Sequence, residues 1–342
     1  MHFISISAAL FRFATTVVLL MSFIVGGKVA VAEPIKIGVF KIAAAAPVFI
    51  AQEKGYFAKE GVPAELIYFE AGPPLVSAVA SGSIDFAADG TTAALFNLAG
   101  QGALRIIGGM YSEAPGFVLL SIVASNHAYD AGLKSLADLA NHTVAIQQAG
   151  GAADYSLSLV EEKYRIAPSA VRRVATQSVP NSLAALLGGQ ADFSVLPITA
   201  VGPSIRRGDI QLLGKIGDET PWQLGAVAAS TNTANQRENT VRAFLRALRG
   251  GFRDYAAAFV DQNGRRKDGP SAPEILAIIA KYVAQPPEQV AAGLAYADPE
   301  GRLDVQDIYR QIEWYKSQGA VRGQFQPQSI IDSRYVVPLA QR

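Results

Sequence analysis

Four short turns of small or hydroxyl-bearing residues stand directly before predicted helices, and their composition suits the binding of polar groups. The turns are residues 43–46, 70–72, 89–92 and 148–151. Free backbone N–H groups at a helix start, together with the helix dipole, bind anions or polar oxygens without any charged side chain. In open α/β sheets, ligands bind at the carboxyl ends of the strands that precede such turns. As a set, the turns predict a binding cleft.

Residues suited to catalysis are scarce in the same sequence. The chain has no cysteine, which excludes thiolate nucleophiles, disulfides and Cys-ligated zinc. His127 and His142 lack metal-ligand spacing and are expected at the surface. No G-x-S-x-G elbow, P-loop or G-x-G-x-x-G fingerprint occurs. We therefore expect a protein that is not an enzyme, with no metal and no cofactor.

Composition limits the class of partner. The 342 residues are 50% hydrophobic and 17% charged, which predicts a folded chain, and the length favours two domains. Lys plus Arg number 30 against 29 Asp plus Glu, a balance that lacks the basic excess of nucleic-acid binding. The expected partner is a small molecule and not a nucleic acid.

The amino terminus has the pattern of a secretory signal peptide. Arg12 closes a weakly basic start, residues 13–25 form an apolar run, and Ala30-Val31-Ala32 precedes Glu33 as an A-x-A cleavage site. Residues 1–32 are predicted to be removed by cleavage after Ala32, which places the mature protein in the periplasm. No cysteine follows the cleavage site, so a lipoprotein is not expected. A buried amino-terminal helix or a retained anchor stays open as the alternative.

Strands alternate with helices along the mature chain, which predicts an α/β protein with mostly parallel sheets. Strands are expected at residues 34–40, 64–69, 84–88, 143–147 and 170–175. The segments around Asp85 and Asp192 follow the same order of helix end, small turn, Asp-Phe, strand and new helix. This agreement predicts two lobes of similar construction. Both aspartates are expected to accept hydrogen bonds from backbone N–H groups.

A helical tail follows Trp222, with helices predicted at residues 237–259, 273–283, 287–295 and 305–318 and with Asp304 as a helix cap. Two crossings, near 120–125 and near 219–225, would insert the second lobe into the first. Lobe 1 is predicted to comprise residues 33–122 and 223–342, and lobe 2 residues 123–222. Each lobe would be a mixed, mostly parallel sheet flanked by helices, with a cleft between the lobes.

Three segments in order carry a resemblance to a known family. They are Glu-x-Gly-Tyr-Phe-x-x-Glu-Gly at 53–61, Ser-Gly-Ser-Ile-Asp-Phe at 81–86, and Ser-Leu-Ala-Asp-Leu at 135–139 before a strand. In these the mature chain is similar to the substrate-binding proteins of ABC importers for nitrate, sulfonates, taurine and thiamine precursors, the NMT1/THI5-like and SsuA-like type. Asn141-His142 departs from the family's Gly-Lys. Tyr56 and Phe57 are expected to anchor the end of the first helix.

The resemblance implies a type II periplasmic-binding-protein fold, a Venus flytrap, and a monomer that delivers its ligand to an ABC permease and its ATPase. It implies ligand contacts from turns of both lobes and from the crossings. These are Phe40, Ala44, Gly72, Pro73, Asp89, Gly90, Thr91, Thr92, Tyr111, Ser112, Gln148, Gly150, Gly151, Asn181, Pro197, Thr199 and Trp222.

The ligand's charge is left open by the residues. No arginine falls at a predicted strand-end turn, and Glu70, Asp89 and Glu113 lie near the expected cleft. A small organic anion, a sulfonate or carboxylate with or without an aromatic ring, is the first hypothesis, and a thiamine-precursor pyrimidine is the second. Two further hypotheses are an enzyme related to pyrimidine synthases, which the absence of cysteine disfavours, and a co-receptor that passes ligand to a sensor.

Overall fold

The computed structural model describes residues 33–340 of the chain, and Pro34 begins one compact unit that holds both predicted lobes. The predicted signal peptide, residues 1–32, lies outside the described residues. Among the helices of the described part, none is both long and apolar enough to cross a membrane.

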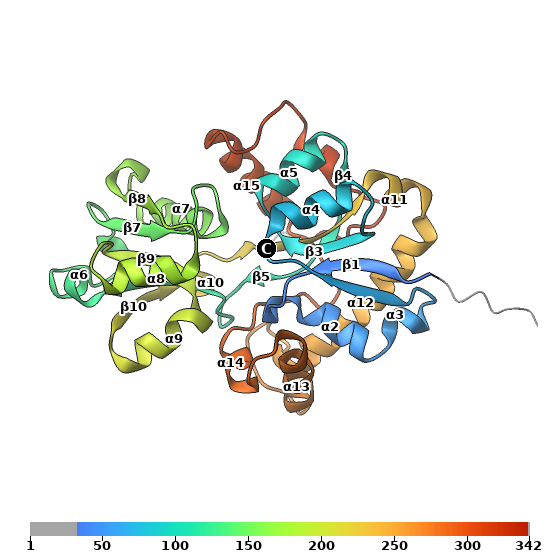
Figure 1. Ribbon diagram of the computed structural model, residues 1–342, viewed down its shortest axis with the longest axis horizontal. Coiled ribbons are helices and arrows are strands. Elements are labelled where there is room, and N and C mark those ends of the chain that lie inside the picture. The colour runs from blue at the N-terminus through green and yellow to red at the C-terminus, as the bar shows by residue number, and fades with distance from the viewer. Residues whose placement is uncertain (1–32, 341–342) are drawn as a thin grey trace, which may run out of the picture. The chain divides into compact units, whose positions relative to one another are not determined.

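Lobe 1 is the part of the molecule built on the sheet in the order β2-β1-β3-β12-β4 (Figure 1). Its strands are β1 Ile35–Val39, β2 Ala64–Tyr68, β3 Phe86–Gly90, β4 Leu104–Gly109 and β12 Gly225–Ser230. The strands β1, β2 and β3 run parallel, whereas β12 is antiparallel to both β3 and β4. The carboxyl ends of β1, β2 and β3 therefore share one edge of the sheet.

Lobe 2 is the part built on the sheet in the order β10-β6-β9-β7-β8. Its strands are β6 Leu120–Ser125, β7 Thr143–Ile146, β8 Arg172–Ala175, β9 Phe193–Pro197 and β10 Ile210–Lys215. Here β7, β8 and β9 run parallel, and β6 is antiparallel to β9 and β10. The two sheets thus share one strand order, with β8-β7-β9-β6-β10 matching β2-β1-β3-β12-β4. The mixed α/β architecture with two sheets confirms the predicted fold class.

The likeness of the two sheets extends to single residues. The Asp85 carboxylate accepts a hydrogen bond from the Lys36 N–H at 2.8 Å, and the Asp192 carboxylate accepts one from the Thr143 N–H at 2.7 Å. The next residue of each pair, Phe86 or Phe193, is buried in its own sheet. The prediction that both aspartates satisfy backbone donors is confirmed, because each one ties the start of its central strand to the neighbouring strand.

Helices cover both faces of the two sheets (Figure 1). In lobe 1 they are α2 Ala46–Glu53, α3 Tyr56–Lys59, α4 Gly72–Ala80, α5 Ala93–Gly100, α11 Thr231–Gln236 and α12 Glu238–Phe259; in lobe 2, α6 Asn126–Asp130, α7 Ala152–Tyr164, α8 Val179–Leu187, α9 Ile198–Arg207 and α10 Ile216–Glu219. Short 3-10 turns stand at Ala43–Ala45, Leu136–Asp138, Pro168–Ala170 and Pro327–Ile330. His127 is exposed, whereas His142, expected at the surface, is half-buried with Nδ1 at 3.4 Å from Asp192, because it stands where β7 approaches β9.

The contact between α12 and α2 depends on a glycine. A Cβ at Gly251 would lie 2.0 Å from the Pro47 carbonyl oxygen, so only glycine allows this approach. The Phe244 ring of α12 stacks on Phe86 and Phe57. Phe57 is buried, and the Tyr56 hydroxyl donates to Asp254 of α12 at 2.6 Å. Tyr56 and Phe57 therefore anchor the end of the first helix, as predicted.

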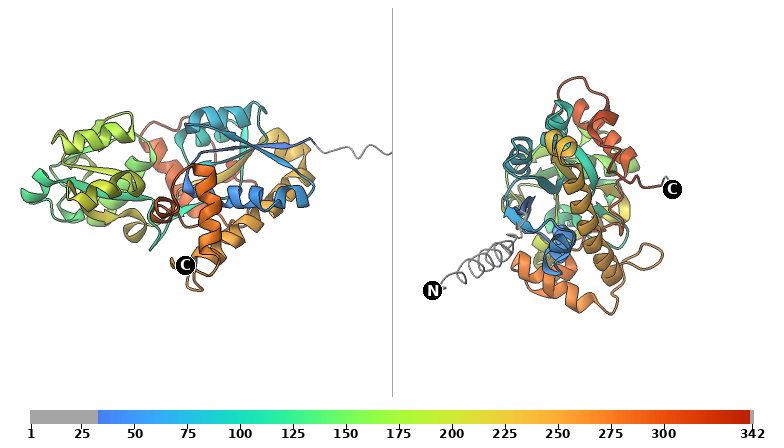
Figure 2. Two further views of the ribbon diagram at one scale, coloured as in Figure 1. Left: turned by 60° about the horizontal axis from the view of Figure 1, so that its bottom comes forward. Right: turned by 90° about the vertical axis from the view of Figure 1, so that its right-hand side faces the viewer.

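The carboxyl-terminal helices are α13 Ala272–Val283, α14 Pro287–Ala292 and α15 Val305–Ser317. They appear in orange to red in Figure 2, where α13 lies beside α2. Residues of α15 join the core on the face of the lobe 1 sheet covered by α4 and α5. Asp304 caps α15 by accepting a hydrogen bond from the Asp307 N–H at 3.0 Å, which confirms the predicted cap.

Two chain crossings join the lobes, and they pair with each other. The strand β5, Ser112–Glu113, is antiparallel to β11, Trp222–Gln223. Because β6 follows β5 and belongs wholly to the lobe 2 sheet, the predicted boundary after residue 122 falls inside a strand. After the first crossing the chain forms β6 of the lobe 2 sheet, and after the second it forms β12 of the lobe 1 sheet. The exact boundaries of the lobes stay a prediction.

Candidate functional site

The carboxyl edge of the lobe 1 sheet brings several predicted ligand residues together. Asp89 and Gly90 end β3, Gly72 begins α4, and Tyr111 stands just before β5. A Cβ at Gly72 would lie 3.3 Å from the Asp89 Oδ2 atom, and a Cβ at Gly90 would lie 3.7 Å from the Tyr111 hydroxyl. Three chain segments therefore meet at one carboxyl group and one hydroxyl.

Asp89 is 2% exposed, and its two oxygens differ in their surroundings. Oδ1 accepts a hydrogen bond from the Gly90 N–H at 2.6 Å, whereas Oδ2 has no hydrogen-bond partner among the described residues. Burial raises the pKa of Asp89 to about 7, against the lowering effect of the Gly90 N–H. Burial, with a smaller contribution from the charge of Asp89, also raises the pKa of Tyr111.

In lobe 2, the turn before α7 is held by a buried ion cluster. Asp154 Oδ2 accepts a hydrogen bond from the Gly150 N–H at 2.9 Å, and Asp154 Oδ1 accepts one from Arg173 Nε at 2.7 Å. Arg173 also donates to both oxygens of Glu161. Gly150 has φ +70°, a conformation that favours glycine. The cluster therefore fixes the backbone of a predicted ligand-binding turn.

The remaining predicted residues lie at strand ends or on the crossings, with varied exposure. Thr92 caps α5, and the Thr91 hydroxyl is occupied by the carbonyl groups of Gln223 and Leu224. Asn181 is exposed and donates to the Thr176 carbonyl within its own lobe. Of the others, Ala44 and Trp222 are buried, Phe40, Ser112, Gly151, Pro197 and Thr199 are half-buried, and Pro73 and Gln148 are exposed.

The two crossing strands separate two faces of the molecule. In their register, Trp222 lies opposite Glu113 and Gln223 opposite Ser112. Because side chains alternate along a strand, Tyr111, Glu113 and Trp222 face one side, whereas Ser112 and Gln223 face the other. A cavity of about 1240 Å³ is lined by both residues of each crossing strand, Ser112, Glu113, Trp222 and Gln223, together with Tyr296 and Tyr309. Ser112 is therefore directed away from Tyr111.

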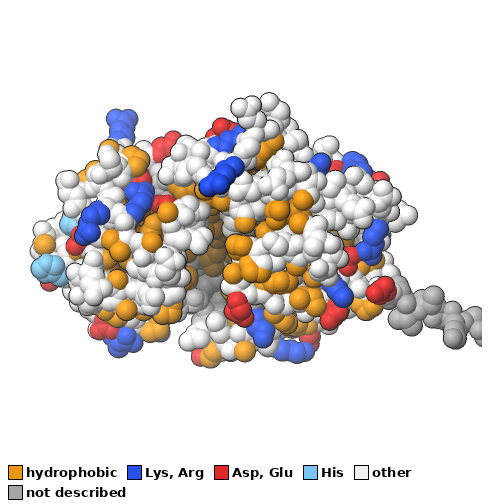
Figure 3. All heavy atoms as spheres, turned by 45° about the horizontal axis from the view of Figure 1, so that its top comes forward, with side chains coloured by type: hydrophobic (Ala, Val, Ile, Leu, Met, Phe, Trp, Pro, Cys, Tyr) orange, Lys and Arg blue, Asp and Glu red, His pale blue; other side chains and the backbone are white. Residues whose placement is uncertain are grey.

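Figure 3 shows a hollow between the two halves of the molecule, with hydrophobic side chains visible in its depth. On the Trp222 side of the crossings, the Tyr155 ring of α7 packs edge-on against Trp222, with ring centroids 4.9 Å apart, and against Trp314 of α15 at 5.1 Å. The Trp222 Nε1 atom is buried and has no partner among the described residues. Aromatic side chains from both lobes and one crossing thus meet here.

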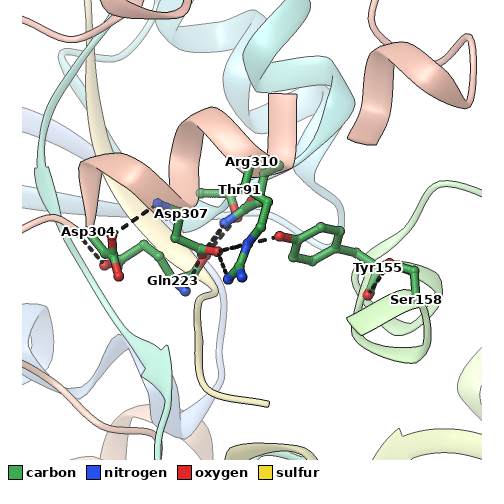
Figure 4. Close-up of polar contacts among 8 residues, drawn as sticks. Thr91, Tyr155, Ser158, Gln223, Asp304, Asp307 and Arg310 are labelled. Carbon is green, nitrogen blue, oxygen red and sulfur yellow. Dashed lines mark hydrogen bonds and ion pairs between the residues drawn. The ribbon is translucent and has the colours of Figure 1, made fainter. Parts of the chain in front are cut away.

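A buried network next to these rings links α15, β11 and lobe 2 (Figure 4). Asp307, 4% exposed, accepts from the Gln223 N–H at 2.7 Å, from Gln311 at 2.8 Å and from the Tyr155 hydroxyl at 3.4 Å. The Gln223 side chain in turn donates to the Tyr111 and Gly225 carbonyl groups. Sequence reasoning missed Tyr155, Gln223 and Asp307, because residues this far apart carry no local pattern.

We expect Asp307→Asn to destabilise the protein by about 1–3 kcal/mol, because the amide accepts fewer of the buried hydrogen bonds that reach this position. Urea denaturation measures the change. Asp304→Asn, one turn earlier, is the matched control and should stay within about 0.5 kcal/mol, since asparagine also caps helices. An equal loss in both variants would contradict a special role for Asp307 at the crossing.

The described residues contain no group of three or more His, Asp or Glu side chains that could hold a metal ion. The potential polar partners for a ligand are instead the Asp89 carboxyl, the Tyr111 hydroxyl, the Trp222 N–H and the backbone at helix starts.

Comparison with known proteins gives one family and many similar structures. The family model described as NMT1/THI5 like matches residues 43–258, a range that includes strands of both sheets. No curated protein matches the chain by sequence.

Among solved structures, the periplasmic aliphatic sulphonate binding protein SsuA from Escherichia coli is 18% identical with a TM-score of 0.71, covering 91% of this chain and 94% of that one. The periplasmic nitrate-binding protein NrtA from Synechocystis PCC 6803 is 16% identical with a TM-score of 0.61, covering 87% and 84%. A Candida albicans protein described as having the generic periplasmic binding protein fold is 13% identical with a TM-score of 0.64, covering 90% and 99%. This chain therefore has the periplasmic-binding-protein fold.

Proposed function

Because the chain belongs to the NMT1/THI5-like family, we propose that it is the extracytoplasmic solute-binding protein of an ABC importer. In this role it binds a small organic molecule between its lobes and delivers it to a membrane permease and its ATPase. The observation that carries the proposal is the family match across both sheets. The similar structures named for sulfonate and nitrate binding support it.

The proposed location is the periplasm, where a freely diffusing monomer would meet its ligand. The signal-peptide pattern with cleavage after Ala32 supports export, and the lack of cysteine supports a protein without a lipid anchor. An amino-terminal sequence of the exported protein that began elsewhere than at Glu33 would count against this location.

Ligand binding would act by closing the lobes. The crossings β5 and β11 would serve as the hinge, and a ligand that contacts both lobes stabilises the closed state by its differential affinity for it. Candidate contacts are those predicted from the sequence, in particular Asp89, Tyr111, the turn at Gly150 and Gly151, and Trp222. A ligand enclosed between two closed lobes is shielded from solvent, which suits a protein that keeps its ligand bound until it contacts a permease.

The proposed ligand is a small organic anion, a sulfonate or carboxylate, with a thiamine-precursor pyrimidine as the second candidate. For the anion, the start of the 13-residue helix α7 offers free backbone N–H groups beside Gln148. For the pyrimidine, the free oxygen of Asp89 is an acceptor that ring amino groups can satisfy.

A binding role also fits better than the competing hypotheses. An enzyme related to the pyrimidine synthases would need that family's cysteine-containing motif, and this chain has no cysteine. A co-receptor that passes ligand to a sensor would use the same lobes and cleft. A permease and an ATPase encoded beside this gene would favour import over sensing.

Ligand binding can be tested without labels, because both tryptophans of the chain, Trp222 and Trp314, pack against Tyr155 of lobe 2. We expect at least one compound from a panel of sulfonates, carboxylates, nitrate and pyrimidines to raise the melting temperature and to change tryptophan fluorescence. Small-angle scattering should show a smaller radius of gyration with that compound. A panel without any such response would overturn the proposal.

A further inference from the structure

The free oxygen of Asp89 requires an explanation. A buried carboxylate oxygen without a hydrogen bond is destabilising, and buried polar atoms in folded proteins nearly always have a partner. Among residues 33–340, none forms a salt bridge with Asp89, and no positive charge contributes to its shifted pKa. Above its pKa of about 7, the ionised Asp89 therefore presents an acceptor for which the described residues supply no donor.

The fold itself does not need a carboxyl group at this position. Asp89 stands four positions after Asp85 on β3, and Leu196 stands four positions after Asp192 on β9, the equivalent strand of lobe 2. Leu196 is fully buried. An apolar side chain thus fills the same place in the second sheet, so the acid at 89 serves something other than packing.

The surroundings of Asp89 suit a donor and not an anion. The nine-residue helix α4 starts beside it with Gly72, Pro73 and Pro74, and the two prolines have no N–H to offer an anionic ligand. A negative ligand group here would also face the carboxylate. A group that carries N–H would instead satisfy the free oxygen.

Two glycines border the acid and the hydroxyl. Gly72 and Gly90 are both half-buried and therefore partly open to solvent, and both lack the side chain that would extend toward the acid or toward Tyr111. The Tyr111 hydroxyl has no hydrogen-bond partner among the described residues. A ligand group that approaches over the two glycines would meet one carboxylate oxygen and one hydroxyl.

We infer that Asp89 and the Tyr111 hydroxyl form a specificity subsite in lobe 1 that accepts a hydrogen bond from an N–H group of the ligand. The chemical class of that ligand end is an amine, an amidine or an amino-substituted ring. The inference rests on the proposed function and assigns the polarity of one end of the ligand. An acidic group at the other end, near the start of α7, is compatible with it.

The test uses pairs of probes that differ only in the N–H group: 4-aminopyrimidine against pyrimidine, and 2-aminoethanesulfonate against ethanesulfonate. Calorimetry at pH 8 compares the full mature chain with Asp89→Asn, Gly72→Ala and the charge-matched control Glu65→Gln, whose side chain is exposed on β2. Asparagine cannot replace the acid, because turning its oxygen toward the ligand would break the bond from the Gly90 N–H. Gly72→Ala keeps the acid and places a methyl group 3.3 Å from Oδ2.

We expect an amino-bearing probe to bind the wild-type chain more tightly than its partner. Asp89→Asn should weaken the binding of the amino-bearing probe about 10- to 100-fold, the range for a charge-assisted hydrogen bond. It should leave the affinity for the probe without the amino group unchanged. Gly72→Ala should weaken the binding of the amino-bearing probe as well, whereas Glu65→Gln should not. Binding without preference for the amino group, and without loss in Asp89→Asn, would overturn the subsite and leave the proposed function standing. Failure of these probes and of the whole ligand panel would overturn both.

Discussion

Asp89→Asn should make the ligand-free protein more stable at pH 8, by about 2 to 4 kcal/mol, and should have little effect at pH 4. The pKa of this carboxyl is about 7 in the folded protein against 3.8 for a free side chain, and each unit corresponds to about 1.4 kcal/mol. Between these values the folded state keeps a proton that the unfolded chain has lost. The stability of the wild-type protein therefore falls as the pH rises through this window, whereas asparagine has no charge to bury.

Urea denaturation of both proteins at several pH values between 4 and 8 checks this expectation. Burial also raises the pKa of Glu113, to about 8, although its carboxylate accepts the Leu120 N–H at 2.7 Å. Glu113 is present in both proteins, so its contribution to the pH dependence of stability cancels in the difference between them. If the difference in the free energy of unfolding between the two proteins stayed constant with pH, the pKa of Asp89 would not be raised by burial, and the expectation would be wrong.

Arg173→Met should destabilise the protein by about 3–5 kcal/mol, because it leaves two buried carboxylates without their cation. Asp154 and Glu161 have side chains 5% and 1% exposed, and Arg173 bridges them at 2.7 Å to each. Burial raises the pKa of Glu161 even with Arg173 in place. The unpaired carboxylates of the variant would take up protons, so its loss of stability should shrink as the pH falls.

Arg173→Met should also loosen the predicted ligand-binding turn at Gly150. Asp154 holds the Gly150 N–H, and without Arg173 its carboxylate is free to move away. Arg172→Met is the matched control, since Arg172 is exposed and, among the described residues, its side chain donates a hydrogen bond only to the Thr143 hydroxyl. Adding Asp154→Asn and Glu161→Gln to the variant should recover most of the stability. An Arg173 variant as stable as the control would contradict the cluster's role.

Local sequence pattern was sufficient for most of the helices and strands. The helix predicted at 237–259 begins at Glu238 and ends at Phe259, and the tail helices begin within a residue of their predicted starts. Asp85, Asp192 and Asp304 make the backbone hydrogen bonds expected of them. These features depend on residues close in the chain or on short βα units, which a single sequence contains in full.

The candidate site was predictable only in outline. Strand-end turns pointed to the edge of each sheet, but they did not show which side chains are free to meet a ligand. Thr91 has its hydroxyl turned to Gln223 and Leu224, and Ser112 lies on the other face of the crossing from Tyr111. Both outcomes depend on strand register between segments more than 100 residues apart, which local spacing does not encode.

By itself, the sequence determined an α/β chain of two similar lobes, without the side chains for thiol chemistry and with small-residue turns at its strand ends. Only the tertiary structure decided that the chain enters the lobe 2 sheet at β6 and returns to the lobe 1 sheet at β12. It also decided that Tyr155 contacts Trp222 and Asp307, and that one oxygen of Asp89 has no hydrogen-bond partner among the described residues. The physical reason is that periodicity and turn chemistry act over a few residues, whereas burial and hydrogen-bond satisfaction depend on which distant segments meet.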